Sequence, residues 1–275
     1  MGRITKKKYA LILFIVIIAV ILMRLFIGQP SYVPSPSMKY SIYDGDFIWV
    51  DKLHYGAKLP KRFSEIPLIN IFTWIESLRN KDANINWGYK RLNGKKKPEL
   101  YDLAVYCIPD KSDVLLVKRL IGLPGDTLLI KDGELYINGE CLKQPNNIIK
   151  TYRDEPVDFP ENTTWSTHNY GPLIIPAAGM TFDLSENNMY YIKSIMEREG
   201  FDFSEGVQNI YTFRENYYFM LGDNRINSYD SRFTGFVSES DLEGVIKFVF
   251  FSIDTYSKSF PGFTFRNNRF FKKIE

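Results

Sequence analysis

Val114-Leu115-Leu116-Val117-Lys118-Arg119-Leu120-Ile121 is apolar apart from two adjacent cations. A run that is apolar on both faces is typical of a strand buried within a sheet. Side chains alternate between the two faces of a strand, so the pattern predicts that Lys118 shares a face with Leu116 and Leu120. We therefore expect an ammonium group set into an apolar surface. The alternative is that Lys118 and Arg119 merely end a strand in solvent.

Turn and strand signals on both sides of this run predict a mainly β protein. Leu123-Pro124-Gly125-Asp126 turns the chain. Asp132-Gly133 lies between two apolar runs, which is a strong hairpin signal. Residues 189–198 are expected to form a short helix, and residues 56–98 look irregular. The predicted strands are 47–50, 103–108, 114–121, 127–130, 134–137, 217–221 and 244–252.

The first 28 residues predict a membrane anchor. Residues 1–8 carry four cations and no acid, and residues 9–28 are apolar except for Arg24. A helix of this length spans about 30 Å, which is one bilayer core, and Arg24 near its far end can reach the headgroups. Positive charge before the span predicts a cytoplasmic N-terminus. A cleavable signal peptide is the alternative, but the apolar run is too long and no small-x-small site follows it.

Composition excludes some classes of protein. A formal net charge of +3 over 275 residues is too small to argue for nucleic-acid binding. His54 and His168 are the only histidines, which excludes a histidine-rich metal site, and no cofactor is expected. Cys107 and Cys141 lack metal-ligand spacing and could be two thiols or one disulfide.

Val33-Pro34-Ser35-Pro36-Ser37-Met38 follows the apolar run closely. Proline fixes φ and pushes the preceding residue toward extended geometry, so we expect a stiff, non-helical segment that presents Ser37. A linker that leaves a membrane helix is the alternative. A serine nucleophile needs a base, and no histidine lies in a motif. Lysine can act as a base only when it is neutral. At its ordinary pKa, roughly 0.04% of lysine side chains are neutral at pH 7, and desolvation on an apolar strand would raise that fraction.

A dense polar loop, Gly222-Asp223-Asn224-Arg225-Ile226-Asn227-Ser228-Tyr229-Asp230-Ser231-Arg232, follows the strand predicted at 217–221. Ser228 could orient a neutral lysine with its hydroxyl group. Asp230 and Arg232 are spaced to pair and to stiffen the loop. A solvated turn or a calcium-binding loop is the alternative, although the spacing does not match an EF-hand.

Three segments in this order, behind a membrane span, resemble type I signal peptidase, the bacterial membrane-bound Ser–Lys endopeptidase that removes signal peptides. The segment 34–38, with Gly45-Asp46 after it, resembles the family's serine box. The segment 117–126 is similar to its lysine box, and the loop 222–232 is similar to its third box. Asn138-Gly139 and Gly235-Phe236-Val237 also fit the family.

The resemblance implies a role for each candidate site residue. Ser37 would be the nucleophile and Lys118 the general base. The hydroxyl group of Ser35 and the backbone N–H of Ser37 would form the oxyanion hole. Ser228 would orient Lys118, and Asp230 and Arg232 would brace the loop. The residues implied to line shallow pockets for small substrate side chains are Val33, Pro34 and Val117.

The resemblance also implies location, partners and domain organisation. We expect a single-pass protein of the bacterial inner membrane with its catalytic domain on the periplasmic side. Its expected partners are exported preproteins and the lipid bilayer, with no nucleic acid, and the chain is expected to be monomeric. The predicted segments are a cytoplasmic N-terminus (1–8), a transmembrane anchor (9–28), a catalytic β domain in two parts (29–144 and 212–275) and an inserted subdomain (145–211).

Some positions depart from the family pattern, and other classes remain as alternatives. Tyr40-Ser41-Ile42 stands where the family usually has Pro-Thr-Leu, and Tyr101-Asp102 stands where it usually has Gly-Asp. Ile226 replaces a usual acid and Ser238 a usual proline. The alternatives are a self-cleaving Ser–Lys repressor, a catalytically dead binding module and a membrane-tethered β module without chemistry. The anchor argues against the first, and the retained polar residues argue against the second.

Overall fold

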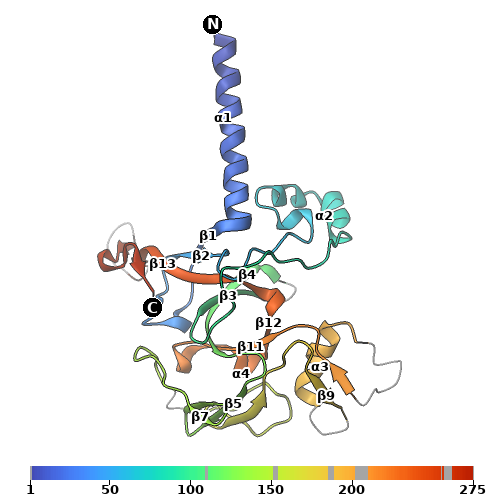
Figure 1. Cartoon of the computed structure of the whole chain (residues 1–275). Coiled ribbons are helices and arrows are strands. Elements are labelled where there is room, and N and C mark those ends of the chain that lie inside the picture. Colours follow the sequence, from blue (N-terminus) through green and yellow to red (C-terminus); the bar gives the residue numbers. More distant parts are fainter. Residues whose placement is uncertain are drawn as a thin grey trace.

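The computed structural model describes residues 2–108, 111–150, 154–184, 189–201, 210–254, 256 and 262–274. Parts of the predicted insertion, residues 151–153, 185–188 and 202–209, lie outside these ranges. An N-terminal helix, α1 (Gly2–Leu22), continues as a π-helical turn, η1 (Met23–Ile27). Figure 1 shows that α1 stands clear of a β-rich body. One helix of the described chain, Lys6–Ile27, is long and apolar enough to cross a membrane.

The chain passes directly from this helix into an edge strand. Strand β1 (Gly28–Tyr32) pairs antiparallel with β2 (Asp46–Asp51) along its whole length. The sequence did not predict β1, because Pro30 has no backbone N–H to donate to a ladder. An edge strand tolerates such a residue. The strand therefore ties the helix to the sheet that carries the candidate site.

The larger sheet forms the part of the body nearest α1. Its strand order is β1-β2-β13-β3-β4-β11-β12, and two short strands also pair with β13. Five predicted strands are confirmed in it: 47–50 as β2, 103–108 as β3, 114–121 as β4, 217–221 as β11 and, extended at both ends, 244–252 as β13. The remaining bounds are β3 (Leu103–Ile108), β4 (Lys111–Gly122), β11 (Tyr217–Leu221), β12 (Val237–Ser238), β13 (Leu242–Asp254), β14 (Thr264–Phe265) and β15 (Lys272–Lys273).

A second antiparallel sheet lies at the end of the body farthest from α1 (Figure 1). Its order is β7-β6-β5-β8, and the hairpin predicted around Asp132-Gly133 is confirmed as β5 and β6. The helix predicted at 189–198 is confirmed as α3. One hydrophobic core joins strands β5, β6 and β8, helix α3 and strand β11. The bounds are β5 (Thr127–Lys131), β6 (Glu134–Ile137), β7 (Glu140–Cys141), β8 (Tyr170–Ile174), β9 (Thr181–Asp183), α3 (Met189–Arg198) and β10 (Ile210–Thr212).

The region 56–98 contains little regular structure, as expected, but it does contain one helix. The short helix α2 (Glu76–Ala83) follows two 3₁₀ turns, η3 (Phe63–Glu65) and η4 (Ile69–Trp74). The helix was missed because most of its eight residues are polar and show no apolar period. Both cysteines are free thiols, with Cys107 buried and Cys141 exposed.

The junction between α1 and the sheet generates a prediction about stability. A Cβ atom added at Gly28 would lie 2.3 Å from the carbonyl oxygen of Val50 and 2.7 Å from the ring of Trp49. Gly28→Ala should therefore force β1 away from β2 and cost about 1–3 kcal/mol of unfolding free energy. Thermal unfolding of the full chain in detergent measures the effect, with Ser31→Ala on the same strand as the control. Equal melting temperatures for the two variants would contradict the prediction.

Candidate active site

Ser37 lies in a single 3₁₀ turn, η2 (Pro36–Met38). The expectation of a non-helical segment was wrong for these three residues, because proline suits the first position of a helix, where its missing N–H is not needed. Ser35 before the turn is extended, as expected, with φ −129° and ψ 150°. The Ser37 side chain is mostly buried, at 8% exposure. The two prolines thus set a sharp change of direction at the serine.

Lys118 reaches Ser37 from strand β4. Its Nζ atom lies 2.9 Å from Ser37 Oγ, although the two residues are 81 positions apart. The lysine is 3% exposed, and Leu116 and Leu120 of the same strand pack into one apolar cluster. Burial lowers the pKa of Lys118, while the carboxylates of Asp230 and Asp223 act in the opposite direction. The geometry therefore places a desolvated amine within proton-transfer distance of a hydroxyl group.

The other residues predicted for substrate contact lie around the serine. Ser35 is exposed, and its Oγ lies 3.4 Å from Ser37 Oγ. Val33 is buried and Pro34 is exposed. Val117, on β4, is half-buried and packs with Val33 in one apolar cluster. The structure thus gathers these residues next to the Ser37–Lys118 contact.

The loop after β11 holds the serine turn through its backbone. The N–H of Asn224 donates to the carbonyl oxygen of Ser37 at 3.0 Å. The side-chain amide of Asn224 donates to the carbonyl of Pro36 at 3.1 Å. The N–H of Asp223 points at the sulfur of Met38 at 3.4 Å. No part in holding the serine turn was predicted for Asn224, although its place between Asp223 and Arg225 in the third box was the available signal.

A buried ion pair lies beneath the serine turn. Arg119 donates to Asp223 through two nitrogens, Nε to Oδ1 at 2.8 Å and Nη2 to Oδ2 at 2.7 Å. Both residues are almost inaccessible, at 1% and 0% exposure. Ser41, three residues after the turn that carries Ser37, also donates to Asp223. Sequence reasoning missed this pair because its members are distant along the chain and each looks like an ordinary polar residue.

Two positions that depart from the family pattern adopt a left-handed backbone. Tyr40 has φ 79° and Tyr101 has φ 72°. Glycine adopts this region without a steric cost, which accounts for the glycine that the family usually places before Asp102. The carbonyl of Tyr101 nevertheless accepts a hydrogen bond from Arg119 Nη1 at 2.9 Å. The substitution therefore leaves the backbone contact to the ion pair in place.

Asp230 and Arg232 form a second buried ion pair. Arg232 donates from Nε and Nη2 to the two carboxylate oxygens of Asp230, each at 2.9 Å. Asp230 also accepts from the backbone N–H of Gly222 at 3.0 Å, which fixes the start of the loop. Both aspartates of the loop, Asp223 and Asp230, are thus bound to guanidinium groups. This pairing argues against the calcium-loop alternative, since a calcium site needs free carboxylate oxygens.

Ser228 is buried against the backbone of the same loop. Its Oγ has no hydrogen-bond partner within the described part of the chain. A Cβ atom added at Gly222 would lie 2.0 Å from that Oγ and 2.7 Å from the carbonyl oxygen of Ser37. Only glycine at position 222 lets Ser228 approach the serine turn so closely. The structure therefore sets a free hydroxyl group near the candidate site without bonding it to Lys118.

Comparisons with known proteins identify relatives of this chain. The family model described as "Signal peptidase, peptidase S26" matches residues 6–251. A signal peptidase I of Buchnera aphidicola subsp. Baizongia pistaciae is 28% identical over 86% of this chain and 74% of its own. A signal peptidase I of Rickettsia typhi is 27% identical over 91% of this chain and 82% of its own.

A crystal structure of a signal peptidase I from Enterococcus faecalis matches 55% of this chain and 97% of its own, at 28% identity and a TM-score of 0.30. The match to the family model extends from the apolar helix through all three segments of the candidate site and most of β13. The chain therefore belongs to the signal peptidase (peptidase S26) family and is a serine peptidase of the signal peptidase I type.

Proposed function

We propose that this chain is a membrane-anchored endopeptidase that cleaves signal peptides from exported preproteins with Ser37 as nucleophile and neutral Lys118 as general base. The observation that carries the proposal is the 2.9 Å contact between two buried groups, Ser37 Oγ and Lys118 Nζ. A neutral amine can take the serine proton as Oγ attacks the scissile carbonyl carbon. The resulting ammonium can then return that proton to the leaving amine, and a water molecule repeats the cycle on the acyl-enzyme.

The electrostatics of the site favour the neutral amine. The two nearby carboxylates, Asp223 and Asp230, are each paired with an arginine, so little negative charge is left to hold a proton on Lys118. Burial is the largest influence on Lys118 and outweighs the attraction of both carboxylates, so the pKa of its amine is lowered.

Oxyanion stabilisation is proposed to come from the serine turn. Pro36 occupies the first position of η2, so Ser37 carries the first N–H of that turn. Such an N–H has no acceptor within its own helix and can donate to a developing negative charge. The Ser35 hydroxyl is proposed as the second donor, and its distance of 3.4 Å from Ser37 Oγ supports this role.

Substrate is proposed to bind as an extended strand. Within the described pairings, β11 covers β4 only from Arg119 to Gly122, so 115–118 pairs with β3 alone. That free backbone edge leads directly to Lys118 and suits β-strand addition by a peptide. Val33, Pro34 and Val117 beside it are proposed to accept small side chains before the cut, as in a small-x-small motif. Helix α1 is proposed to anchor the monomeric chain in the bacterial inner membrane, with residues 1–8 cytoplasmic and the body outside.

Removal of the nucleophile tests the reaction itself. Ser37→Ala should reduce preprotein cleavage by the full chain in detergent on the order of 10⁶-fold, because no other group supplies the attacking oxygen. Gel analysis of a preprotein with alanines before the cut measures the rate, with Ser31→Ala as the control for a nearby serine. Cleavage by Ser37→Ala at the wild-type rate would rule out the mechanism.

The lowered pKa of Lys118 has a consequence for stability. Between that lowered pKa and about 10.4, the unfolded chain binds more protons than the folded chain, so wild-type stability rises with pH. Lys118→Met lacks this pH-dependent contribution to the free energy of unfolding. The variant should be more stable than wild type at neutral pH, and the difference should shrink toward pH ~10.4. Urea unfolding in detergent across this range measures it, with exposed Lys193→Met as the control. Parallel stability curves for wild type and Lys118→Met would show that the lysine is not desolvated.

Ser228 is proposed to orient the Lys118 amine during turnover. Its buried hydroxyl group has no partner among the described residues, so Ser228→Ala should leave stability unchanged or slightly higher. The same variant should lower kcat about 10²-fold if the hydroxyl positions the base. Ser238→Ala is the matched control, because that buried hydroxyl bonds Ser240 at 2.8 Å and its loss should lower stability but not kcat. An unchanged kcat in Ser228→Ala would remove Ser228 from the mechanism.

A further inference from the structure

The region 61–92 places apolar side chains on its outer surface. It lies between β2 and β3 and contains η3, η4 and α2. None of the residues of η3 and η4 is buried, and α2 buries only Asp82. Trp74 is 84% exposed, which is extreme for a side chain that usually covers a large area. The other large exposed apolar side chains are Phe63, Leu68, Ile71, Phe72, Ile75, Leu78, Trp87, Tyr89 and Leu92.

Polar contacts hold the region together, along with one ring contact between Phe63 and Trp87, whose centroids lie 4.9 Å apart. The buried carboxylate of Asp82, on α2, accepts hydrogen bonds from the backbone N–H groups of Phe63 at 2.9 Å and Ser64 at 3.3 Å. Glu65 accepts from the N–H of Lys61 at 2.8 Å. Because these bonds fix η3 against α2, the side chains of η4 are left to face outward. An exposed apolar patch of this kind marks an interaction surface.

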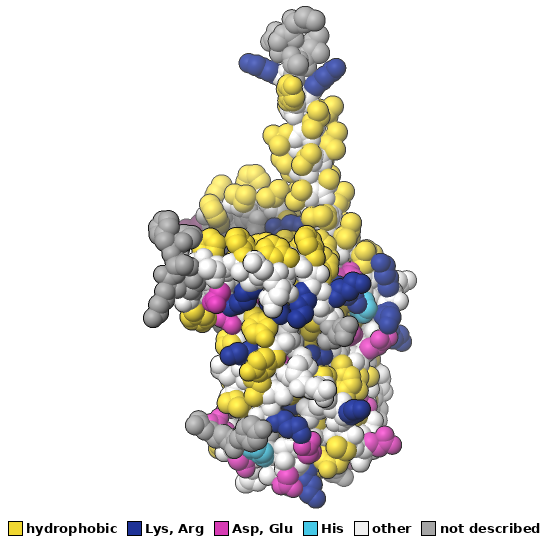
Figure 2. All heavy atoms as spheres, turned by 90° about the vertical axis from the view of Figure 1, so that its left-hand side faces the viewer, with side chains coloured by type: hydrophobic (Ala, Val, Ile, Leu, Met, Phe, Trp, Pro, Cys, Tyr) yellow, Lys and Arg dark blue, Asp and Glu magenta, His cyan; other side chains and the backbone are white. Residues whose placement is uncertain are grey.

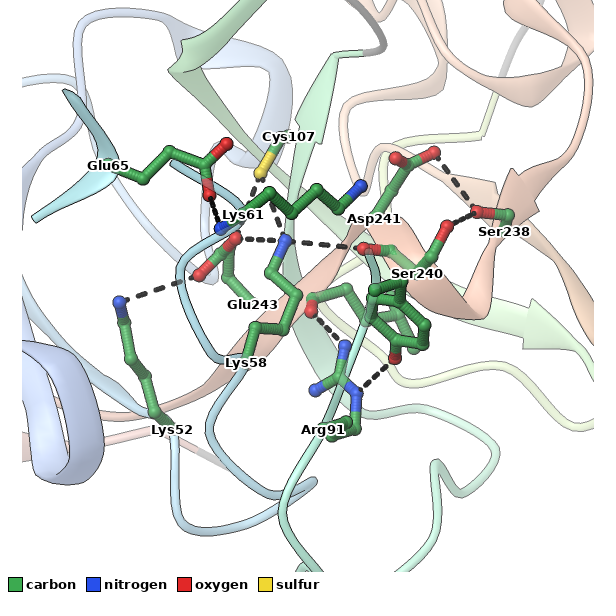
Figure 3. Close-up of polar contacts among 12 residues, drawn as sticks. Lys52, Lys58, Lys61, Glu65, Arg91, Cys107, Ser238, Ser240, Asp241 and Glu243 are labelled. Carbon is green, nitrogen blue, oxygen red and sulfur yellow. Dashed lines mark hydrogen bonds and ion pairs between the residues drawn. The ribbon is translucent and has the colours of Figure 1, made fainter. Parts of the chain in front are cut away.

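Ion pairs and hydrogen bonds hold the base of the region on the sheet (Figure 3). Lys58 forms an ion pair with Glu243 of β13 and donates to the carbonyl of Ser240 at 3.3 Å. Arg91, at the other end, donates to the carbonyl of Gly56 at 2.8 Å and to that of Glu239 at 3.0 Å. The two ends are thus fixed to the body that carries the site, and the apolar surface has a defined position on it.

That position is at the level of the lower end of helix α1. Figure 1 shows the turquoise segment around α2 at the height of the last turns of α1, on the α1 side of the larger sheet. Figure 2 shows hydrophobic side chains along α1 and across the part of the body below it. A second exposed aromatic patch, Phe265, Phe270 and Phe271, lies near the C-terminus, on strands and turns that pack on β13.

We propose that residues 63–87 enter the interfacial layer of the membrane that holds α1, with Trp74 and Phe72 in contact with lipid. The proposal rests on the anchoring proposed for α1. A bilayer that surrounds α1 would contact every protein surface at the level where the helix ends. A single protein partner would cover only one of those surfaces. Trp and Tyr favour the interface, and the six cations and three acids of 61–92 suit anionic headgroups. The contact would also fix the Ser37 site at a constant distance from the bilayer.

Quenching of tryptophan fluorescence by brominated lipid tests this docking. Two full-length variants are reconstituted in vesicles of phosphatidylcholine and phosphatidylglycerol, with or without bromine near the top of one acyl chain. One variant keeps only Trp74 (Trp49→Phe, Trp87→Phe, Trp165→Phe). The control keeps only Trp165 (Trp49→Phe, Trp74→Phe, Trp87→Phe), which packs in the core farthest from α1. Trp74 should lose most of its emission in brominated vesicles, and Trp165 should keep its emission.

Preprotein cleavage by the same vesicles separates this proposal from the proposed function. An unquenched Trp74 in vesicles that still process a preprotein would overturn the docking and leave the peptidase mechanism standing. Emission from Trp74 that is unquenched but blue-shifted would mean that protein covers the patch, and that also overturns it. A quenched Trp74 in vesicles without cleavage would support docking and count against the proposed function.

Discussion

The burial of Lys118 against Ser37 is the constraint on which the rest of the site depends. Each unit by which a lysine pKa falls represents about 1.4 kcal/mol of cost for the charged form. Strand β4 holds the amine among buried neighbours, with 3% exposure. Two aspartates close enough to restore the charge are instead bound by Arg119 and Arg232. The fold thus keeps the carboxylates that brace the loop while limiting their effect on the base.

The same ion pairs explain how three distant segments meet. The β4 strand supplies Lys118 and Arg119 in succession, one toward the serine and the other toward Asp223. The loop after β11 contacts the serine turn in addition, because Asn224 donates hydrogen bonds to the backbone of that turn. Burying an ion pair gains little by itself, but removing one partner leaves an uncompensated charge. The arrangement therefore makes the position of the nucleophile depend on the integrity of the loop.

Much of the fold was predictable because the strands carry strong local signals. The buried run 114–121, the Asp132-Gly133 hairpin and α3 all have patterns that tertiary contacts did not override. Strand β1 and helix α2 were missed, one because it contains Pro30 and the other because it is short and polar. The subdomain boundaries proposed at 145 and 211 stay predictions, although one core joins parts of both sides. In the site, Ser37 and Lys118 came from motifs, whereas the Arg119–Asp223 pair arises from long-range packing that no local pattern encodes.

The protonation state of Lys118 is the central claim, and NMR titration measures it most directly. The full chain in detergent, with ¹³C at the lysine Cε carbons, gives one resonance per lysine, and its absence in Lys118→Met assigns the signal of Lys118. The account predicts that this resonance titrates clearly below the other lysines, because burial lowers its pKa. A Lys118 pKa at the ordinary value of about 10.4 would contradict it, since a protonated ammonium cannot accept the proton of Ser37.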